Sequence, residues 1–349
     1  MKSRRLLTVC IPAYNRADLL APLLASIFGQ HFSDFDVLIC EDGSPERAAI
    51  TDVVKRFQLK YPEQLRYEEN ASNLGYDGNI RRLVERSSGQ YCVFMGNDDL
   101  MCAGALAVIA SAIHRQPNCG VVVRSYATFD DDPEKYKQVF RYFPHEYVLP
   151  PGAQAISTAY RRSVVIPGMV LHRDSALAVT AARFDGTLLY QLYLVGMILA
   201  KRSVVFLPQI IALRRDGTPP DFGNSASEQG KFVPHDQTPE SSIHFMQGML
   251  SIAQYVEEAT QIRVFDAIRS DIGNYSYPIL SIQGKRSFVV FVKYGLALAR
   301  LGLWRYPLFH LYFFTLLLLG SDRADCIIKM IKQRLGHTPR FGTARTGRL

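Results

Sequence analysis

Residues 91–99, Tyr91-Cys92-Val93-Phe94-Met95-Gly96-Asn97-Asp98-Asp99, form an apolar run that ends in two adjacent carboxylates. The apolar part is typical of a buried β-strand. Carboxylates at the mouth of a buried strand cost desolvation energy unless a positive group pairs with them. A divalent Mg²⁺ or Mn²⁺ ion that also carries substrate phosphates is one such partner. The alternative is that Asp99 caps a helix over residues 102–115.

Strand and helix patterns alternate through the first 125 residues. We predict strands at residues 6–11, 35–40, 65–68, 90–95 and 119–125. Helices are expected between them, at residues 15–28, 47–59, 77–88 and 102–115. This alternation predicts an α/β fold with a mostly parallel central sheet and helices on both faces.

Polar clusters follow three of the predicted strands, at 12–15, 41–44 and 97–99. Ligands of such sheets bind beyond the carboxyl ends of the strands. Tyr14 could stack on a nucleotide base, and Asp42 could accept hydrogen bonds from the base or the ribose. Each residue also has a plainer interpretation, because Tyr14 could be a packed loop aromatic and Asp42 could belong to a tight turn. Together the clusters indicate a site for a nucleotide sugar, with Asp98 and Asp99 at the ribose and a metal.

Four ordered motifs carry a resemblance to a known family. They are VCIPAYNR (9–16), ICEDGS (39–44), NLGYDGNI (73–80) and SSGQYCVFMGNDDL (87–100). In order and spacing they resemble the family 2 glycosyltransferases with the GT-A fold. The GNDD form, with HRDSAL at 172–177 and RFDG at 183–186, is most similar to bacterial O-antigen sugar transferases of the abequosyltransferase type.

The resemblance implies a set of site residues and a metal cofactor. It implies that Tyr14 stacks on the base and that Asp42 binds the base. The last two acids of the DxD-type motif, Asp98 and Asp99, are implied to contact ribose and a Mg²⁺ or Mn²⁺ ion, and Gly96 stands where the family often has a first Asp. The implied nucleotide-sugar site comprises Pro12, Tyr14, Asn15, Asp42, Gly43, Ser44, Asn73, Gly75, Asn79, Asn97 and Asp98.

The family inverts the anomeric centre of the sugar, so a carboxylate must deprotonate the acceptor hydroxyl. In the family this base usually lies in an acidic motif near the start of a helix. The corresponding stretch here, 187–192, contains no acid, and Asp185 is the nearest carboxylate. Asp185 could instead cap the helix predicted over residues 188–200. His172 is a further candidate base, although a single His beside a strand is more often structural.

The C-terminal third differs in character from the rest. A loop rich in Gly, Pro and Ser is expected at 216–239, and the chain after it is helical. Residues 285–349 contain twelve Lys and Arg and two Asp, a net charge of +10, so the preceding residues carry about −2 of the total of +8. The apolar segment at 306–320 is about 15 residues long, short of the roughly 20 that span a bilayer.

An apolar helix beside basic residues suits a peripheral anchor on an anionic membrane surface. The alternative is a buried core helix with a solvated basic tail. The six cysteines form no CxxC pair, and Cys10, Cys40 and Cys92 lie in strand-like runs. They are expected to be buried thiols in a reducing compartment. We therefore expect a cytoplasmic protein on the inner face of the cytoplasmic membrane.

Three regions are predicted: a nucleotide-sugar-binding half (1–125), an acceptor-binding half (126–239) and a helical, basic, membrane-associating region (240–349). The predicted function is metal-dependent transfer of a sugar from a nucleotide-sugar donor to a lipid-linked oligosaccharide, with no nucleic-acid partner. A polysaccharide-synthase-type transferase is an alternative, although the sequence has no QxxRW signature. A catalytically silent nucleotide-binding scaffold is another, because the base motif is missing.

Overall fold

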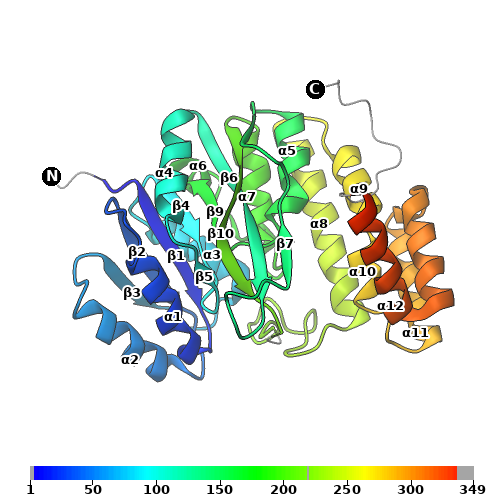
Figure 1. Cartoon of the computed structure of the whole chain (residues 1–349), viewed down its shortest axis with the longest axis horizontal. Coiled ribbons are helices and arrows are strands. Elements are labelled where there is room, and N and C mark those ends of the chain that lie inside the picture. Colours follow the sequence, from blue (N-terminus) through cyan, green and yellow to red (C-terminus); the bar gives the residue numbers. More distant parts are fainter. Residues whose placement is uncertain (1–3, 218–219, 336–349) are drawn as a thin grey trace.

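In a computed structural model of the chain, which describes residues 4–217 and 220–335, a ten-stranded sheet lies between layers of helices (Figure 1). The strands are β1 (Leu7–Ala13), β2 (Phe35–Glu41), β3 (Leu65–Glu69), β4 (Tyr91–Phe94), β5 (Leu100–Met101), β6 (Cys119–Phe129), β7 (Gln138–Phe140), β8 (Tyr147–Leu149), β9 (Met169–His172) and β10 (Ser203–Arg215). The helices of the sheet region are α1 (Ala17–Phe28), α2 (Arg47–Gln58), α3 (Gly75–Arg86), α4 (Ala105–Arg115), α5 (Ala153–Tyr160), α6 (Arg173–Leu177) and α7 (Tyr190–Leu199).

The sheet is mixed, which corrects the expectation of a mostly parallel one. Its order is β3-β2-β1-β4-β9-β6-β10-β5, with β7 beside β6 and β8 beside β10. The pairs β2–β3, β1–β2, β1–β4 and β6–β10 are parallel, as the alternating pattern predicts. Strand β9 enters between β4 and β6 and runs antiparallel to both. Short antiparallel strands also flank β6 and β10.

Helices cover both faces of the sheet, as predicted. On β1, Val9 and Ile11 pack into one hydrophobic core with α1, α2 and α4, whereas Cys10 faces a second core with α3, α5 and α7. Side chains of successive strand residues point to opposite faces, so a strand buried on both sides is apolar throughout. Cys10, Cys40 and Cys92 are free and buried, which confirms their prediction as core thiols.

The apolar run at 164–171, whose composition is typical of a strand, forms strand only from Met169. Pro167 and the left-handed Gly168 (φ 76°) interrupt it, and residues 164–167 become a loop instead. The fully buried Arg124 on β6 holds this loop by donating to the carbonyl oxygens of Pro167 at 2.5 Å and Val165 at 2.7 Å. The loop therefore has a defined position beside the sheet.

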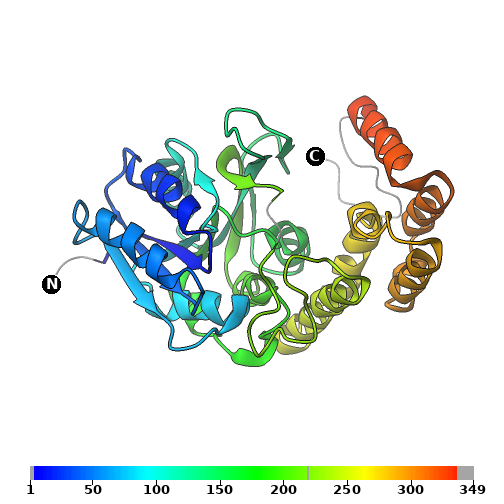
Figure 2. The ribbon, with the colours of Figure 1, turned by 90° about the horizontal axis from the view of Figure 1, so that it is seen from below.

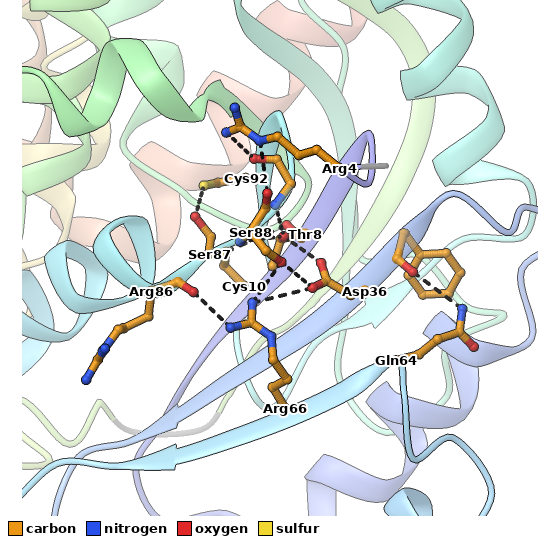
Figure 3. Close-up of polar contacts among 12 residues, drawn as sticks. Arg4, Thr8, Cys10, Asp36, Gln64, Arg66, Arg86, Ser87, Ser88 and Cys92 are labelled. Atoms are coloured by element: carbon orange, nitrogen blue, oxygen red, sulfur yellow. Dashed lines mark hydrogen bonds and ion pairs between the residues drawn. The ribbon is translucent and has the colours of Figure 1, made fainter. Parts of the chain in front are cut away.

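A polar network ties the sheet together at the amino ends of its strands (Figure 3). Asp36, at the start of β2, accepts hydrogen bonds from Thr8 at 2.6 Å and Ser88 at 2.5 Å, and Arg66 of β3 lies 3.4 Å from it. Arg4 donates to the carbonyl oxygens of Ser88 and Gly89. These contacts satisfy buried polar groups, which leaves the opposite, carboxyl ends of the strands for ligands.

The start of α7 is held by a carboxylate from α3. Asp77, 1% exposed, accepts hydrogen bonds from the backbone N–H groups of Thr187, Leu188 and Tyr190, each at 2.8 Å. Asp185 does not cap this helix, as one interpretation had it, because its carboxylate is bound by Arg81 at 2.6 Å. Asp99 caps no helix either, since α4 begins only at Ala105.

The C-terminal helices extend the molecule at the end opposite α2 (Figures 1 and 2). They are α8 (Pro239–Thr260), α9 (Phe265–Asn274), α10 (Tyr277–Ser281), α11 (Phe288–Arg300) and α12 (Pro307–Leu335), which is interrupted at Gly320. Their buried residues join the same core as α5 and α7.

The predicted apolar helix at 306–320 forms the first part of α12, and it has two faces. Four of its residues are buried, namely Leu308, Phe309, Tyr312 and Leu316, and four of its large apolar residues are exposed, namely Leu311, Phe314, Leu318 and Leu319. No helix within the part of the chain that the structure describes is long and apolar enough to span a bilayer.

Replacing Asp77 with Asn tests the hold on α7. Burial raises the pKa of Asp77 to about 7 against the opposing effect of its three amide donors, so at pH 8 the carboxylate is charged and accepts all three. An Asn side chain has one acceptor oxygen instead of two, and its NH₂ group would face a backbone N–H that also needs an acceptor. We expect the free energy of unfolding at pH 8 to fall by about 1–3 kcal/mol in urea titrations.

The matched control is Asp52→Asn on the exposed face of α2, which should change that free energy by less than about 0.5 kcal/mol. Equal stability of the two variants would contradict this role for Asp77.

Candidate functional site

A cleft of about 460 Å³ opens at the carboxyl ends of β1, β2, β4 and β10. One side carries residues that the sequence predicted, and the other is formed by the loop at 164–167 and by segments between β10 and α8. The predicted residues that line it are Pro12, Tyr14, Asp42, Asn73, Gly75, Asn79, Asn97, Asp98 and Asp99. The three strand-end clusters are thus brought together as expected.

The acid pair lies at the centre of the cleft. Asp99 is 3% exposed, and its Oδ1 accepts a 3.0 Å hydrogen bond from the backbone N–H of Arg215 at the end of β10. Burial raises the pKa of Asp99 to about 8, and the neighbouring Asp98 carboxylate adds to the rise. Asp98 forms an ion pair with Arg16, which also lies 3.5 Å from Asp221. The site therefore holds two carboxyl groups close together where little water reaches them.

The acid pair fits a divalent cation. A Cβ built on Gly96 would overlap Asp99 Oδ2 and come within 3.2 Å of Asp98 Oδ1, so the absence of a side chain at Gly96 lets one oxygen of each carboxylate approach the same point. Among the described residues, no three His, Cys, Asp or Glu side chains converge as a metal-binding group. Two carboxylates match Mg²⁺ or Mn²⁺, which take their remaining ligands from phosphates and water.

Asp42 is held in place by the residues around it. Its Oδ1 accepts from Asn70 Nδ2 at 2.8 Å and from the Leu74 N–H at 2.9 Å, while Asn79 donates to the Cys40 carbonyl at 3.0 Å. Burial raises the pKa of Asp42 to about 6, and these donors oppose the rise. The Asp42 carboxylate also lines the cleft, where a ligand can approach it.

Three predicted residues lie beside the cleft rather than in its wall. Gly43 and Ser44 donate their backbone N–H groups to Glu41 at 3.0 and 2.6 Å. Asn15, which has a left-handed backbone (φ 53°), accepts at its carbonyl from Asn97 at 2.8 Å. These residues shape the loops that present Tyr14 and Asp42, and they do not themselves line the cleft.

The two candidate bases also lie outside the cleft wall. Asp185 is paired with Arg81, as described above, and burial raises its pKa. His172 caps α6, because its Nδ1 accepts from the backbone N–H of Ser175 at 3.3 Å, and its ring lies edge-on against Tyr91. Burial lowers the pKa of His172, so it is neutral near pH 7. This environment is that of a structural histidine.

Charged residues that the sequence analysis missed complete the cleft. They are Arg16, Arg214, Arg215, Asp216, Asp221 and Glu228. The signal for Arg214–Asp216 was present, because these polar residues directly follow the apolar run of β10. The rule applied to the first three clusters would have found them. Asp221 and Glu228 lie in the irregular segment before α8, where no periodic pattern identifies them.

Glu228 fixes the segment that covers one end of the cleft. Its carboxylate accepts from the backbone N–H groups of Tyr76 at 2.8 Å and Gly223 at 2.9 Å, and the residue is 3% exposed. Gly75 (φ 79°) allows this contact, since a Cβ there would lie 2.8 Å from Glu228 Oε1. The NLGYDG motif at 73–78 therefore binds this segment through Glu228 and also forms part of the cleft wall.

Comparisons with known proteins agree with this arrangement. Residues 8–179 match the model of the family described as Glycosyl transferase family 2. The chain is 31% identical over 111 residues to abequosyltransferase RfbV of Salmonella typhimurium, covering 32% of this chain and 33% of that protein. It is 30% identical over 104 residues to the GalNAc(5)-diNAcBac-PP-undecaprenol beta-1,3-glucosyltransferase of Campylobacter jejuni, covering 30% and 33%. The matches thus span about a third of these relatives.

Solved structures share the fold over most of the chain. S. aureus TarS is 14% identical with a TM-score of 0.55, covering 97% of this chain and 94% of that one. Mannosyltransferase PcManGT of Pyrobaculum calidifontis, in complex with GDP-Man and Mn²⁺, is 14% identical with a TM-score of 0.53, covering 94% and 88%. The chain therefore has a GT-A-like α/β fold.

Replacing Asp99 with Asn tests the acid pair. The change keeps the side-chain shape but removes one charge from the pair. We expect Mn²⁺ affinity, measured calorimetrically with UDP or GDP present, to fall at least about tenfold. Turnover of the donor should fall at least about 10²-fold, a loss of roughly 2.7 kcal/mol of transition-state stabilisation.

EDTA should lower turnover of the unaltered protein to a similar degree. Asp132→Asn, on an exposed loop, is the matched control and should leave both quantities unchanged. Full turnover in EDTA would rule out a metal at this site.

Proposed function

We propose that the chain is a metal-dependent, inverting glycosyltransferase of family 2, because residues 8–179 match the model of that family. It would transfer a sugar from a nucleotide-sugar donor to a lipid-linked oligosaccharide during O-antigen or surface polysaccharide synthesis. The observation that carries the proposal is the meeting of Tyr14, Asp42 and the Asp98–Asp99 pair in one cleft.

The donor would lie along the carboxyl ends of β1, β2 and β4. Tyr14 lines the cleft and is available to stack on the base, and Asp42 offers a carboxylate oxygen to a base N–H. Asn73, Gly75 and Asn79 form the adjoining wall. The remaining proposed members of the nucleotide-sugar site, Asn15, Gly43 and Ser44, act by shaping the loops behind it.

Asp98 and Asp99 would hold a Mg²⁺ or Mn²⁺ ion, which when bound neutralises charge on the donor diphosphate. The chain itself keeps the pair in position. Arg215 donates its backbone N–H to Asp99 and its Nε to the carbonyl of Asp98 at 3.3 Å. Arg16 pairs with Oδ2 of Asp98, so Oδ1 of that carboxylate would act as the ligand.

Inversion requires one carboxylate to take the proton of the acceptor hydroxyl. Asp185, which follows the HRDSAL segment, is the proposed base. It now pairs with Arg81, so it must reach the acceptor by a change at that ion pair. Asp221 is a second candidate, because it lines the cleft and lies 3.5 Å from His235 Nε2. Hydrogen bonds at catalytic sites often tighten only when substrate binds.

The proposed acceptor is a glycan on a polyprenyl diphosphate, and the proposed partner surface is an anionic membrane. The name of the Campylobacter jejuni relative specifies a PP-undecaprenol acceptor for that protein. On α12 of this chain, Leu311, Phe314 and Leu318 recur every three or four residues and so form one exposed apolar stripe. Lys285 and Lys293 are exposed nearby in sequence. This combination suits peripheral binding at the inner face of the cytoplasmic membrane.

The division of labour follows the three regions expected from sequence. We propose that residues 1–125 bind the donor, 126–239 contribute the acceptor side, and 240–349 carry the membrane-associating surface. The part of 240–349 that the structure describes shares its core with α5 and α7, so this region is packed onto the acceptor side.

A screen of nucleotide sugars against the purified protein, read by mass spectrometry, tests the proposed activity. One donor should be hydrolysed slowly in the presence of Mn²⁺ and transferred when a lipid-linked acceptor is supplied. Nucleotide binding without hydrolysis or transfer of any donor would instead favour the catalytically silent scaffold.

A pair of variants tests the base. Asp185→Asn should lower kcat at least about 10²-fold while the Kd for the nucleotide changes less than twofold, because Asp185 lies outside the wall of the cleft that would hold the donor. Asp221→Asn, measured alongside by the same assay, should keep kcat within a few-fold. The reverse result would reassign the base to Asp221.

Vesicle sedimentation tests the membrane surface. Phe314→Ser combined with Leu318→Gln should weaken binding to anionic vesicles at least about tenfold without altering the fold, since both side chains are exposed. Salt at 1 M shortens electrostatic screening to about 3 Å and should release only part of the bound protein.

Leu59→Gln is the matched control, because Leu59 on the opposite end of the molecule is an isolated apolar side chain with 85% exposure. If the unaltered protein ignores anionic vesicles at low salt, the membrane assignment fails.

A further inference from the structure

Two arginines end β10 at the cleft, and Arg215 is committed to the fold. Its backbone N–H donates to Asp99, its Nε to the carbonyl of Asp98, and its Nη1 to the carbonyl of Asp130 at 2.9 Å. The guanidinium also lies 4.7 Å from the centre of the Phe129 ring. Arg215 therefore fixes the acid pair and has little freedom to follow a ligand.

Arg214 differs from its neighbour in having unused hydrogen-bonding capacity. It lines the cleft, and its Nη2 donates to Asp216 Oδ1 at 3.0 Å. Its Nε is buried and finds no hydrogen-bond partner among the described residues. A buried donor without an acceptor is destabilising, because it has lost its hydrogen bonds to water. An anion in the cleft would supply the missing acceptor.

Asp216 can release Arg214 without losing its own counter-ion. Lys137 Nζ lies 3.0 Å from Asp216 Oδ2 and 3.1 Å from Asp130 Oδ1. Burial acts to raise the pKa of Asp216, yet Lys137 and Arg214 together hold the pKa below its usual value. The carboxylate thus stays charged and remains paired with Lys137 when Arg214 turns toward a ligand.

We infer that Arg214 is a diphosphate-binding residue of the cleft, which exchanges Asp216 for the diphosphate of the nucleotide donor. The inference rests on the proposed function and adds a residue that the family motifs do not supply. A guanidinium presents a fork of donors that matches phosphate oxygens. The donor, rather than the acceptor lipid, is the source, because β10 places Arg214 next to the residue that binds Asp99.

Arg214 would act on the charge that transfer creates. The bond between the anomeric carbon and the phosphate oxygen breaks, and its electron pair stays on that oxygen. The acceptor oxygen forms the new bond to carbon, and its proton passes to the carboxylate base. The nucleoside diphosphate then leaves with one more negative charge on its terminal phosphate. Hydrogen bonds from Arg214 strengthen as this charge develops, which favours the transition state.

Calorimetric titration with UDP and GDP, and with UMP and GMP, in the presence of Mn²⁺ tests the inference on the full chain. Arg214→Gln should weaken binding of the diphosphate at least about tenfold and of the monophosphate less than threefold. Arg214→Lys, which keeps the charge without the fork, should fall between Arg214→Gln and the unaltered protein. Asp216→Asn removes the competing carboxylate and should strengthen diphosphate binding about two- to fivefold.

Arg56→Gln on α2 is the control for loss of one exposed positive charge and should change none of these affinities. If Arg214→Gln fails to fold, as judged by thermal unfolding, the other two variants still test the inference. Diphosphate affinity should fall in Arg214→Lys and rise in Asp216→Asn. Diphosphate affinity that stays within twofold in the Arg214 variants would overturn the inference while leaving the proposed function intact.

Two further outcomes show whether Arg214 binds the diphosphate of the donor or that of the lipid acceptor, and whether the proposed function holds. Farnesyl diphosphate, a soluble prenyl diphosphate, should compete with the acceptor equally well for the unaltered protein and for Arg214→Gln. Weaker competition by farnesyl diphosphate, with unchanged UDP and GDP binding, would move Arg214 to the acceptor and overturn the donor assignment. Absence of any nucleotide binding by the unaltered protein would overturn the proposed function and this inference together.

Discussion

The hydrogen bond from the Arg215 N–H to Asp99 Oδ1 joins the two sides of the cleft. Asp99 follows β4 in the first part of the chain, whereas Arg215 ends β10, more than a hundred residues later. A buried carboxylate without such a donor would be costly, so this contact stabilises the end of β10 beside the acid pair. Because β10 ends there, Arg214 and Asp216 lie in the wall of the same cleft. The second half of the site is therefore positioned by the acid pair of the first.

Charges inside the cleft are arranged as pairs that a substrate can exchange. Arg16 contacts both Asp98 and Asp221, and Arg214 contacts Asp216. Each pair limits the desolvation cost of its members in the folded protein. A nucleoside diphosphate would pair with the arginines, and its cation would pair with the carboxylates. Both kinds of buried charge would then keep a partner of opposite sign. Asp42 is different, because its neighbours are neutral amide donors and burial raises its pKa to about 6.

Sequence reasoning was most successful where short-range periodicity decides structure. Apart from the short β5, which was not predicted, the strands and helices from β1 to α4 lie within a few residues of their predicted bounds. Tyr14, Asp42 and Asp99 line one cleft, as expected. It failed where contacts distant in sequence decide. The apolar run before Met169 gives no sign that the buried Arg124 will hold part of it as a loop. Nor does the stretch before α7 show that its backbone N–H groups donate to Asp77, about 110 residues earlier in the chain, and not to Asp185.

The C-terminal helices are connected to the cleft by buried polar contacts as well as by the shared core. Gln283, fully buried after α10, donates to the carbonyl of Gln237 at 2.6 Å, and Gln237 lines the cleft. Arg286, just before α11, pairs with Asp236 at 2.8 Å. A membrane bound at the exposed stripe of α12, as proposed, would therefore meet a body that is continuous with the cleft wall. Docking would then set the height of the cleft above the lipid headgroups, and this height would limit which glycan lengths reach the acid pair. On this argument the helical region would contribute to acceptor selection through geometry, in addition to Phe245 of α8, which lines the cleft.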